Sequence, residues 1–307
     1  MVSPASTTFS RPDLGASFEA FDLVAERAGL IGARVLPVFE SAIGQGNFSK
    51  VPVEQLLQEK SLKRTPGAGY ARSTWTFDQD SFQCIERGAE EPCDTREAAL
   101  YSYSLDVERI CAERAFGHVL RDFEIEVATK VLDTSVISNA AVSGSAWTNN
   151  SSGLPVDDVI AALNAIRTNS GLDANAVVMD LSLFRHLQTS DQILDRIKYM
   201  GMNDAPASVN ARALAQVFGV DEVIIAGGVK NTANEGQTAS LSGIFDGTKC
   251  LVAKLPKSAD LREPCLGRTF HFAGDGSSPA VTIESYRDES VRSTIYRARM
   301  DYDCKII

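Results

Sequence analysis

Several residue groups in this 307-residue chain could support chemistry, and the first is the glycine-bearing stretch GAGYAR at positions 67–72. It begins like the turn that cradles the phosphates of a dinucleotide, but Arg72 stands where that pattern needs its third glycine. It also follows no apolar strand. The chain contains no GxxxxGK(S/T) phosphate loop and no GxSxG nucleophile elbow. These motifs therefore predict neither a nucleotide site nor a hydrolase.

Histidines and neighbouring carboxylates are the next candidates for acid–base or metal chemistry. The three histidines are far apart in the sequence, at His118, His186 and His271. None has a second histidine at a spacing that would place both on one face, so each is expected to be an ordinary core or surface residue. Asp157–Asp158 and Glu90–Glu91 could be paired carboxylates, but a helix N-terminus and a solvated acidic run explain them more simply.

Cysteine chemistry is equally weakly indicated. No two of the six cysteines have C-x-x-C spacing; they are Cys84, Cys93, Cys111, Cys250, Cys265 and Cys304. We expect reduced, partly buried thiols rather than a disulfide framework or a structural metal site. The sequence therefore favours a protein that is not an enzyme, with no catalytic residue, no bound cofactor and no metal ligand.

Composition and charge restrict the class of protein further. The chain is 44% hydrophobic and 23% charged, as in ordinary globular proteins, and its net charge is -10. That charge disfavours broad electrostatic binding to nucleic acid. No apolar stretch approaches the roughly 20 residues that span a bilayer. The N-terminal stretch MVSPASTTFSRPDLG lacks a charged-then-apolar leader, so we expect no export.

Residues Lys50 to Cys84 have the pattern of an out-and-back excursion. LKRTPGAGYAR supplies turn residues for its tip, and RSTWTFDQDSFQC supplies β-prone residues for its return. From Lys50 to Arg72 five basic and two acidic residues give a net charge of +3. From Asp78 to Glu97 two basic and seven acidic residues give -5. The contrast indicates either complementary surfaces or two independent, solvated charged loops.

A long helical pattern begins at Asp94, which forms a capping box with Glu97 three residues later. If unbroken to Val136, the helix has about 42 residues and a length of roughly 63 Å. Two apolar stripes follow the helical period, at Tyr103, Val107 and Ile110, and at Phe116, Val119, Phe123, Val127 and Val131. A compact chain of this length is only about 50 Å across. We therefore expect an elongated, slab-like protomer whose flanks other copies cover.

The rest of the chain has an α/β pattern and then a terminal hairpin. After the linker SGSAWTNNSSG come a helix at 155–167, the strand NAVVMD, a helix or helix pair in LSLFRHLQTSDQILDRIKYM, the helix NARALAQVFG and the strand DEVIIAGG. LSGIFDGTKCLVAKLP predicts a hairpin-like pair with Asp-Gly at its turn. In VRSTIYRARMDYDCKII apolar and charged residues alternate, which predicts a long strand with one buried and one charged face.

The order of these elements resembles the major capsid protein of tailed bacteriophages, which has the Hong Kong 97-type fold. SFQCIERGAEEPCD running into EAALYSYSLDVERICAERAFGHVLRDFEIEVA is similar to the return of that family's extended loop into its spine helix. AVVMDLSLFRHLQTSDQILDRIKYM and LAQVFGVDEVIIAGG are similar to parts of its axial domain. The resemblance covers nearly the whole chain.

This resemblance implies an α+β fold with five consecutive parts. They are an N-terminal arm (1–47), an extended loop (48–85), a peripheral domain with a long spine helix (86–150), an axial domain (151–265) and the return strands of the peripheral domain (266–307). The extended loop would then grip a neighbouring copy. The charged residues expected at contacts between subunits are Lys63, Arg64, Arg72, Glu90, Glu91, Arg297 and Arg299.

The resemblance also implies a function: self-assembly as hexamers and pentamers into the icosahedral head shell around double-stranded DNA. The implied partners are many copies of the chain itself, scaffolding, portal and decoration proteins, and packaged DNA on the inner surface, without a membrane. The implied location is the virion, after assembly in the host bacterial cytoplasm. An encapsulin-like nanocompartment shell, and a soluble oligomeric α/β enzyme with its site between Gly153 and Pro264, remain alternatives.

Overall fold

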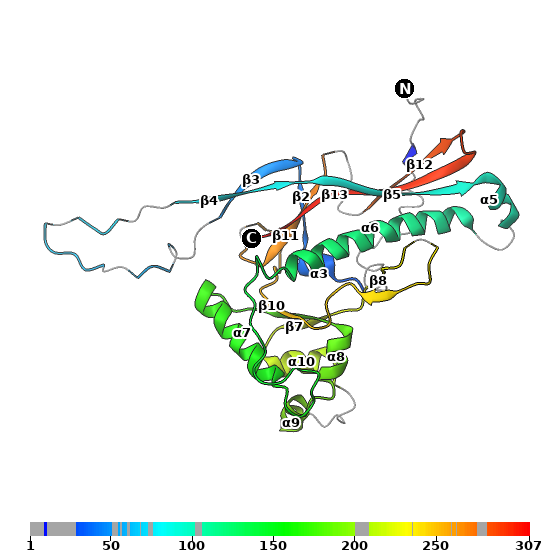
Figure 1. Ribbon diagram of the computed structural model, residues 1–307. Helices are drawn as coiled ribbons and strands as arrows, with labels where there is room; N and C mark the ends of the chain where they lie inside the picture. Colours follow the sequence, from blue (N-terminus) through cyan, green and yellow to red (C-terminus); the bar gives the residue numbers. More distant parts are fainter. Residues whose placement is uncertain are drawn as a thin grey trace.

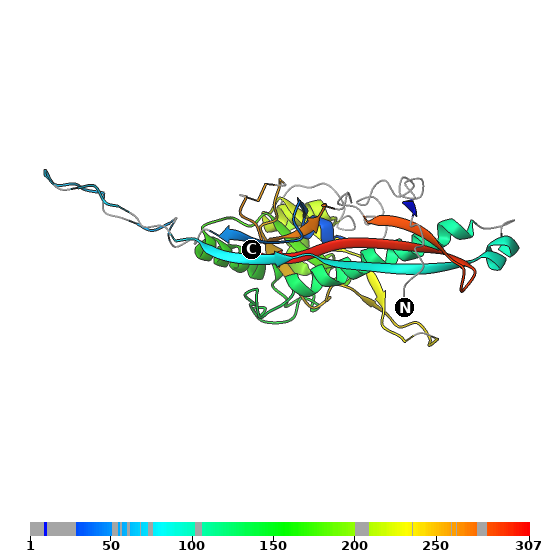
Figure 2. The same cartoon turned by 90° about the horizontal axis from the view of Figure 1, so that it is seen from above.

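The computed structural model describes residues 9–10, 29–50, 55, 57–59, 62–67, 69–72, 76–101, 106–199, 209–234, 236–258, 260–261, 263–274 and 281–307. Figure 1 shows three parts: a sheet that lies along a long helix, a smaller α/β region beneath them, and an arm that extends from one end. Seen from above, the molecule is a narrow slab (Figure 2). The elongated shape expected from the sequence is therefore observed.

The larger sheet is organised around β13 (Ser293–Ile306), whose two edges are both paired. On one edge β5 (Ile85–Asp94) pairs antiparallel with it over ten positions, from Ser293↔Asp94 to Tyr302↔Ile85. On the other edge β12 (Thr282–Asp288) and then β11 (Gly267–Phe272) pair antiparallel with successive parts of β13. The outer strands are β1 (Phe9–Ser10), antiparallel to β12, and β2 (Val38–Ser41), parallel to β11. The predicted terminal hairpin is thus confirmed as β12–β13.

The long helix α6 (Val107–Val131) packs across one face of this sheet and forms its core. All five residues of the second predicted apolar stripe are buried, from Phe116 to Val131. They meet the apolar face of β13, where Tyr296, Ala298 and Met300 are buried at alternate positions. The rings of Phe123 and Tyr302 meet edge to face, with centroids 5.2 Å apart. The terminal strand therefore has one buried face and one charged face, as its alternating sequence predicted.

The prediction of one 42-residue helix is wrong. A short helix, α5 (Thr95–Tyr101), comes first, and α6 has 25 residues, or about 38 Å. The Asp94 side chain does accept from the backbone N–H groups of Arg96 and Glu97, as predicted for a cap. Asp106 caps a second helix in the same way by accepting from the N–H of Arg109 at 3.2 Å. This second cap is why the apolar pattern does not continue as one helix.

The smaller region has a three-stranded sheet, β10-β6-β7, between its helices and α6. On β6, Val177 and Met179 join the core of the helices, while Ala176 and Val178 join the core around α6. The small sheet is therefore a middle layer, buried on both faces. Its elements are α7 (Pro155–Ser170), β6 (Ala176–Asp180), α8 (Leu181–Leu187), α9 (Asp191–Tyr199), α10 (Ala211–Phe218), β7 (Glu222–Ala226), β8 (Val229–Asn231), β9 (Leu241–Gly243) and β10 (Cys250–Ala253).

Most predicted elements of this region are confirmed, but the hairpin at Asp-Gly is wrong. β9 pairs with β8, whereas β10 pairs antiparallel with β6. Between them Ile244 and Phe245 are both buried, so this part of the chain turns into the core instead of alternating along a ladder. The predicted end of α10 at Gly219 is confirmed, since that residue has a φ of 73°, which suits glycine.

The linker before α7 is fixed by a carboxylate in the first turn of that helix. Asp158 accepts from the indole N–H of Trp147 at 2.7 Å and from the N–H of Ser143 at 2.8 Å. Burial raises the pKa of Asp158, but these hydrogen bonds outweigh it and hold the pKa below the ordinary value of 3.8. The neighbouring Asp157 accepts from Gln192 instead. Both carboxylates therefore have the structural role expected of them.

Replacing Asp158 with Asn is expected to lower the free energy of unfolding by about 1–2 kcal/mol at pH 7, because one of two charge-assisted hydrogen bonds is lost. A carboxylate whose pKa is lowered in the folded state stabilises the fold at pH values above its ordinary pKa of 3.8. This contribution is lost as the pH falls through the folded pKa. The deficit of the variant should therefore shrink below about pH 4 in urea unfolding curves. Asp157→Asn, at an exposed position, is the matched control and should change stability by less than about 0.5 kcal/mol. A deficit independent of pH would contradict the assignment.

Candidate functional site

The arm is the feature that most distinguishes this protein from a compact domain. Its two strands, β3 (Gln45–Lys50) and β4 (Asp78–Gln83), pair antiparallel from Gln45↔Gln83 to Lys50↔Asp78. The 27 positions between them, 51–77, lie beyond this ladder. Figures 1 and 2 both show the arm extending away from the body. The excursion predicted from Lys50 to Cys84 is therefore confirmed, and its paired base begins earlier, at Gln45.

The base of the arm is anchored to the large sheet. The ring of Phe82 stacks on that of Phe270 with centroids 4.3 Å apart, and Phe48 stacks on the same ring at 5.3 Å. Lys50 and Asp80 form an ion pair of 2.7 Å across the two strands. The ammonium group of Lys50 holds the pKa of Asp80 below its ordinary value. A rigid base therefore positions the outer part of the arm.

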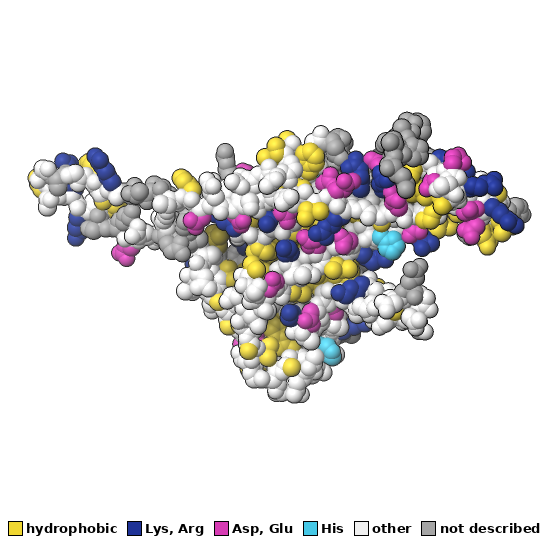
Figure 3. All heavy atoms as spheres, turned by 45° about the horizontal axis from the view of Figure 1, so that its top comes forward, with side chains coloured by type: hydrophobic (Ala, Val, Ile, Leu, Met, Phe, Trp, Pro, Cys, Tyr) yellow, Lys and Arg dark blue, Asp and Glu magenta, His cyan; other side chains and the backbone are white. Residues whose placement is uncertain are grey.

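The outer part of the arm displays apolar and basic side chains together. Leu62 is 79% exposed and Tyr70 75% exposed. The guanidinium of Arg64 lies over the ring of Tyr70, 4.8 Å from its centroid, and Lys63 and Arg72 are exposed nearby in the chain. Figure 3 shows that Lys and Arg side chains gather at the free end of the arm. Apolar area and positive charge are thus presented far from the core of the same chain.

Three other predicted contact residues are brought together on the sheet face opposite α6. Arg297 lies between Glu90 on β5 and Glu284 on β12, both directly opposite it in the ladders. Its guanidinium is 2.7 Å from Glu90 and 3.8 Å from Glu284, and Arg299 is 3.1 Å from Glu284. Figure 3 shows this mixture of charge on the face. These residues pair within the chain, and contacts with another subunit stay a prediction.

Glu91 is separated from Glu90 because β5 is a strand, which directs neighbouring side chains to opposite faces. Its carboxylate lies toward α6, 3.6 Å from Arg114 and 3.5 Å from Nε2 of His118. The side chain of Glu91 is only 15% exposed. The prediction of a solvated acidic run is therefore wrong at this position, because the run forms a strand.

Glu124 is a buried anchor that sequence reasoning missed. It lies on α6, is 1% exposed, and accepts from the N–H groups of Ile31 at 2.9 Å and Gly32 at 2.6 Å. These N–H groups begin the short helix α3 (Gly32–Val35). Burial raises the pKa of Glu124 although the two hydrogen bonds act against it. The signal in the sequence was an acidic residue directly after Phe123 in an otherwise apolar stripe.

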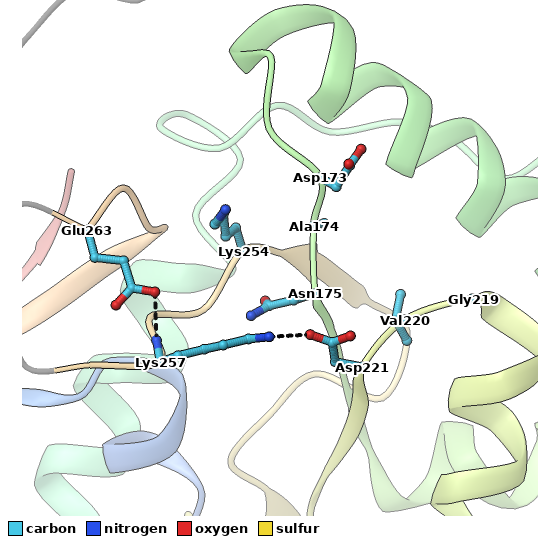
Figure 4. Close-up of a pocket in the computed structure, with 9 residues that line it drawn as sticks. All are labelled: Asp173, Ala174, Asn175, Gly219, Val220, Asp221, Lys254, Lys257 and Glu263. Carbon is cyan, nitrogen blue, oxygen red and sulfur yellow. Dashed lines mark hydrogen bonds and ion pairs between the residues drawn. The ribbon is translucent and has the colours of Figure 1, made fainter.

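A surface hollow of about 450 Å³ lies in the smaller region, at the turns before β6 and β7 (Figure 4). Its charged groups are largely paired, because Lys257 is 2.6 Å from Asp221 and the Glu263 carboxylate accepts from the Lys257 N–H at 3.0 Å. The Asn175 amide exchanges two hydrogen bonds with the backbone of Leu255. The described residues that line the hollow include no histidine, cysteine, serine or threonine. The arrangement ties a surface segment to the sheet.

The histidines lie far apart in the structure as described and share no site. His271 is buried, with Nδ1 2.8 Å from the carbonyl of Asp301, and His186 is exposed on α8. Within the described ranges, no group of three His, Cys, Asp or Glu residues could hold a metal ion. Among the helices that the structure describes, none has both the length and the apolar character to cross a membrane.

Comparison with known proteins relates this architecture to shell proteins. No protein-family model and no curated protein sequence matches the chain. A phage-related protein from Bordetella bronchiseptica RB50 superposes with a TM-score of 0.70 at 21% identity, over 97% of this chain and 94% of that one. The mature capsid of bacteriophage PhiM1 superposes with a TM-score of 0.52 at 14% identity, over 88% and 80%. The chain has the Hong Kong 97-type fold.

An encapsulin also shares this fold. The holo encapsulin complex from Synechococcus elongatus PCC 7942 superposes with a TM-score of 0.52 at 10% identity, over 89% of this chain and 82% of that one. In this chain, the arm is continuous with the large sheet, and α6 packs against that sheet. At these identities the likeness establishes the architecture, and the biological role is a separate question.

Proposed function

We propose that this protein is a major capsid protein, whose copies assemble as hexamers and pentamers into the icosahedral head of a tailed phage. The observation that carries the proposal is the arm. Its exposed residues Leu62, Tyr70 and Phe77 have no place in the core of their own chain, whereas a neighbouring copy could cover them. Each copy would give an arm and receive one, so that every contact is repeated around a closed ring.

The proposed parts follow the boundaries expected from the sequence. Residues 48–85 are the extended loop, 86–150 and 266–307 the peripheral domain, 151–265 the axial domain, and 1–47 the N-terminal arm. The proposed partners are scaffolding, portal and decoration proteins and double-stranded DNA on the inner surface. A net charge of -10 suits a shell that holds its DNA without binding it tightly. The proposed role is structural and not catalytic, in the virion after assembly in the bacterial cytoplasm.

An encapsulin-like nanocompartment is the second candidate, since an encapsulin shares the fold. The contents of purified particles distinguish the two roles. A phage head encloses double-stranded DNA, whereas a nanocompartment encloses cargo protein. A soluble α/β enzyme gains no support from the hollow of the smaller region, because its charged groups are largely paired with one another.

Electron microscopy of the protein purified from its natural source tests the proposal. Closed shells with sixfold and fivefold capsomers and nuclease-protected DNA are expected. Small oligomers at every concentration tried, or closed shells that hold protein cargo and no DNA, would rule out the phage-head role.

Reversing the charges of Lys63, Arg64 and Arg72 to Glu is expected to reduce shell yield at low salt, because the acidic residues proposed to face them would then repel the arm. A loss of about 1 kcal/mol per contact is repeated on every copy of the shell. Sedimentation separates shells from free subunits and measures the yield. A variant with Gln at the same three positions serves as the control. Its shell yield should lie between that of the parent and that of the triple Glu variant. If yield does not change at any salt concentration, the arm does not use these charges.

A further inference from the structure

Two buried thiols meet where the strand that continues the arm packs on the long helix. Cys93 is the penultimate residue of β5, and Cys111 lies near the beginning of α6. Their side chains are 4% and 8% exposed, and both belong to the same buried cluster around α6. The sulfur of Cys111 is also 4.0 Å from the carbonyl oxygen of Pro92, the residue before Cys93. Both views show β5 and α6 side by side (Figures 1 and 2).

Three of the remaining cysteines have quite different neighbours. The sulfur of Cys84 contacts the carbonyl of Phe270 at 3.5 Å. That of Cys304 contacts the Thr269 hydroxyl at 3.6 Å, and that of Cys265 contacts the carbonyl of Gly267 at 3.6 Å. These three thiols therefore contact oxygen atoms, whereas Cys93 and Cys111 lie in one buried cluster and influence each other's pKa.

We propose that Cys93 and Cys111 are a site of disulfide formation within the protomer, through exchange with a small-molecule disulfide such as oxidised glutathione. In the first step one protein thiolate attacks a sulfur of the small disulfide, forms a mixed disulfide and releases one thiolate. The second protein thiolate then attacks the mixed disulfide and releases the other. The two cysteines lose two hydrogens in total, and the small disulfide is reduced to two thiols.

Cys111 is the thiol that attacks first. Burial raises the pKa of both cysteines, that of Cys93 to about 11, so both are protonated at neutral pH. At Cys111 the interaction with Cys93, and to a smaller degree the guanidinium of Arg114, lowers the pKa and favours the thiolate, although the carboxylate of Glu91 opposes them. A disulfide bond is about 2.05 Å long, so the two sulfurs must approach by rotation of their side chains. Because both thiols are buried, the small disulfide can reach Cys111 only when β5 and α6 move apart locally, so the reaction is slow in the native state.

The bond would fasten the strand that continues the arm to the helix that supports the sheet. It would close the chain between residues 93 and 111, which includes α5. Closing such a loop restricts the unfolded chain and stabilises the folded one. The inference does not depend on the proposed function, since it concerns one protomer in any assembly state.

The test uses the purified full-length protein, first reduced with dithiothreitol, desalted, and then incubated with oxidised glutathione under native conditions. Remaining thiols are alkylated in denaturant, and the digest is analysed by mass spectrometry without reduction. We expect a linked pair of peptides containing Cys93 and Cys111, lighter by two hydrogens than the separate peptides. We also expect the melting temperature to rise by about 5–10 °C and to return after dithiothreitol.

Two variants complete the test. Cys111→Ala should show neither the linked peptides nor the rise in melting temperature. Cys84→Ala, which removes a thiol at the base of the arm, should show both, like the parent. If Cys93 and Cys111 are both recovered as separately alkylated residues after oxidation, or if the linked peptides join other cysteines, the inference is overturned.

Discussion

Replacing residues 51–77 with the dipeptide Asn-Gly is expected to abolish shell formation and to leave a folded protomer. Lys50 and Asp78 are opposite each other in the ladder, so a two-residue turn can join them. The stacking of Phe82 and Phe48 on Phe270 remains in this variant. What is lost is the outer arm, whose described residues include no buried side chain and which is proposed to supply area to contacts between copies. Sedimentation and electron microscopy measure assembly, and circular dichroism with thermal melting measures folding.

A second variant separates the length of the arm from its contacts. Changing Leu62, Tyr70 and Phe77 to Ser keeps the full arm but removes three exposed apolar side chains. Loss of their burial in each contact should lower shell yield more than tenfold, with the melting temperature of the free subunit unchanged. Normal shells from the shortened protein would show that the arm is dispensable and would remove the main support for the proposed function.

Replacing Glu124 with Ala is expected to lower the free energy of unfolding by about 3 kcal/mol. The substitution removes the acceptor of the Ile31 and Gly32 N–H groups and leaves a cavity between α3 and α6. Position 32 is already crowded, since a Cβ there would lie 2.7 Å from Oε2 of Glu124. The N-terminal segment should therefore detach, which limited proteolysis near residues 29–36 would detect. Urea unfolding gives the change in stability.

Glu113→Ala is the matched control on the same helix. Glu113 forms an exposed ion pair with Arg109 at 2.9 Å, so its loss should change the free energy of unfolding by less than about 0.5 kcal/mol. If Glu124→Ala and Glu113→Ala changed the free energy of unfolding equally, Glu124 would contribute no more than an exposed residue of the helix.

The pH dependence gives Glu124 a distinct signature. Burial raises its folded pKa above the ordinary value of 4.5, so the folded state binds the proton more tightly than the unfolded state. Its contribution to stability is greatest below 4.5 and declines as the pH rises through the folded pKa. Glu124→Gln, which has no such proton, should lack this component when stability is plotted against pH. Identical pH profiles for the parent and the Gln variant would contradict the raised pKa.

The fold could be predicted from the sequence where one interaction dominates a local pattern. The alternation of Tyr296, Ala298 and Met300 with charged residues predicted a strand buried on one face, because that face packs on α6. The uninterrupted helix could not be excluded, since Asp106 resembles any other acidic surface residue until its cap is formed. The Asp-Gly hairpin failed because burial of Ile244 and Phe245 in the core overrides the turn preference of the two residues after them.

The candidate contacts were less predictable than the fold. Charge alone selected Glu90 and Arg297, but their pairing joins residues 207 positions apart and depends on the ladder between β5 and β13. Glu91 was grouped with Glu90 because nothing in an acidic run reveals the alternation of a strand. Glu124 was missed because its partners are backbone N–H groups, which every residue type except proline can supply.

The continuity of the arm with the sheet determines how the protein carries tension. Only Cys84 separates the return strand β4 from β5, and β5 is paired with β13 over ten positions. A pull along the arm therefore acts parallel to both strands, so that the hydrogen bonds between them share the load instead of opening one at a time. Traction from a neighbouring molecule would reach the middle of the sheet directly, and the sheet would yield only when the whole ladder slides.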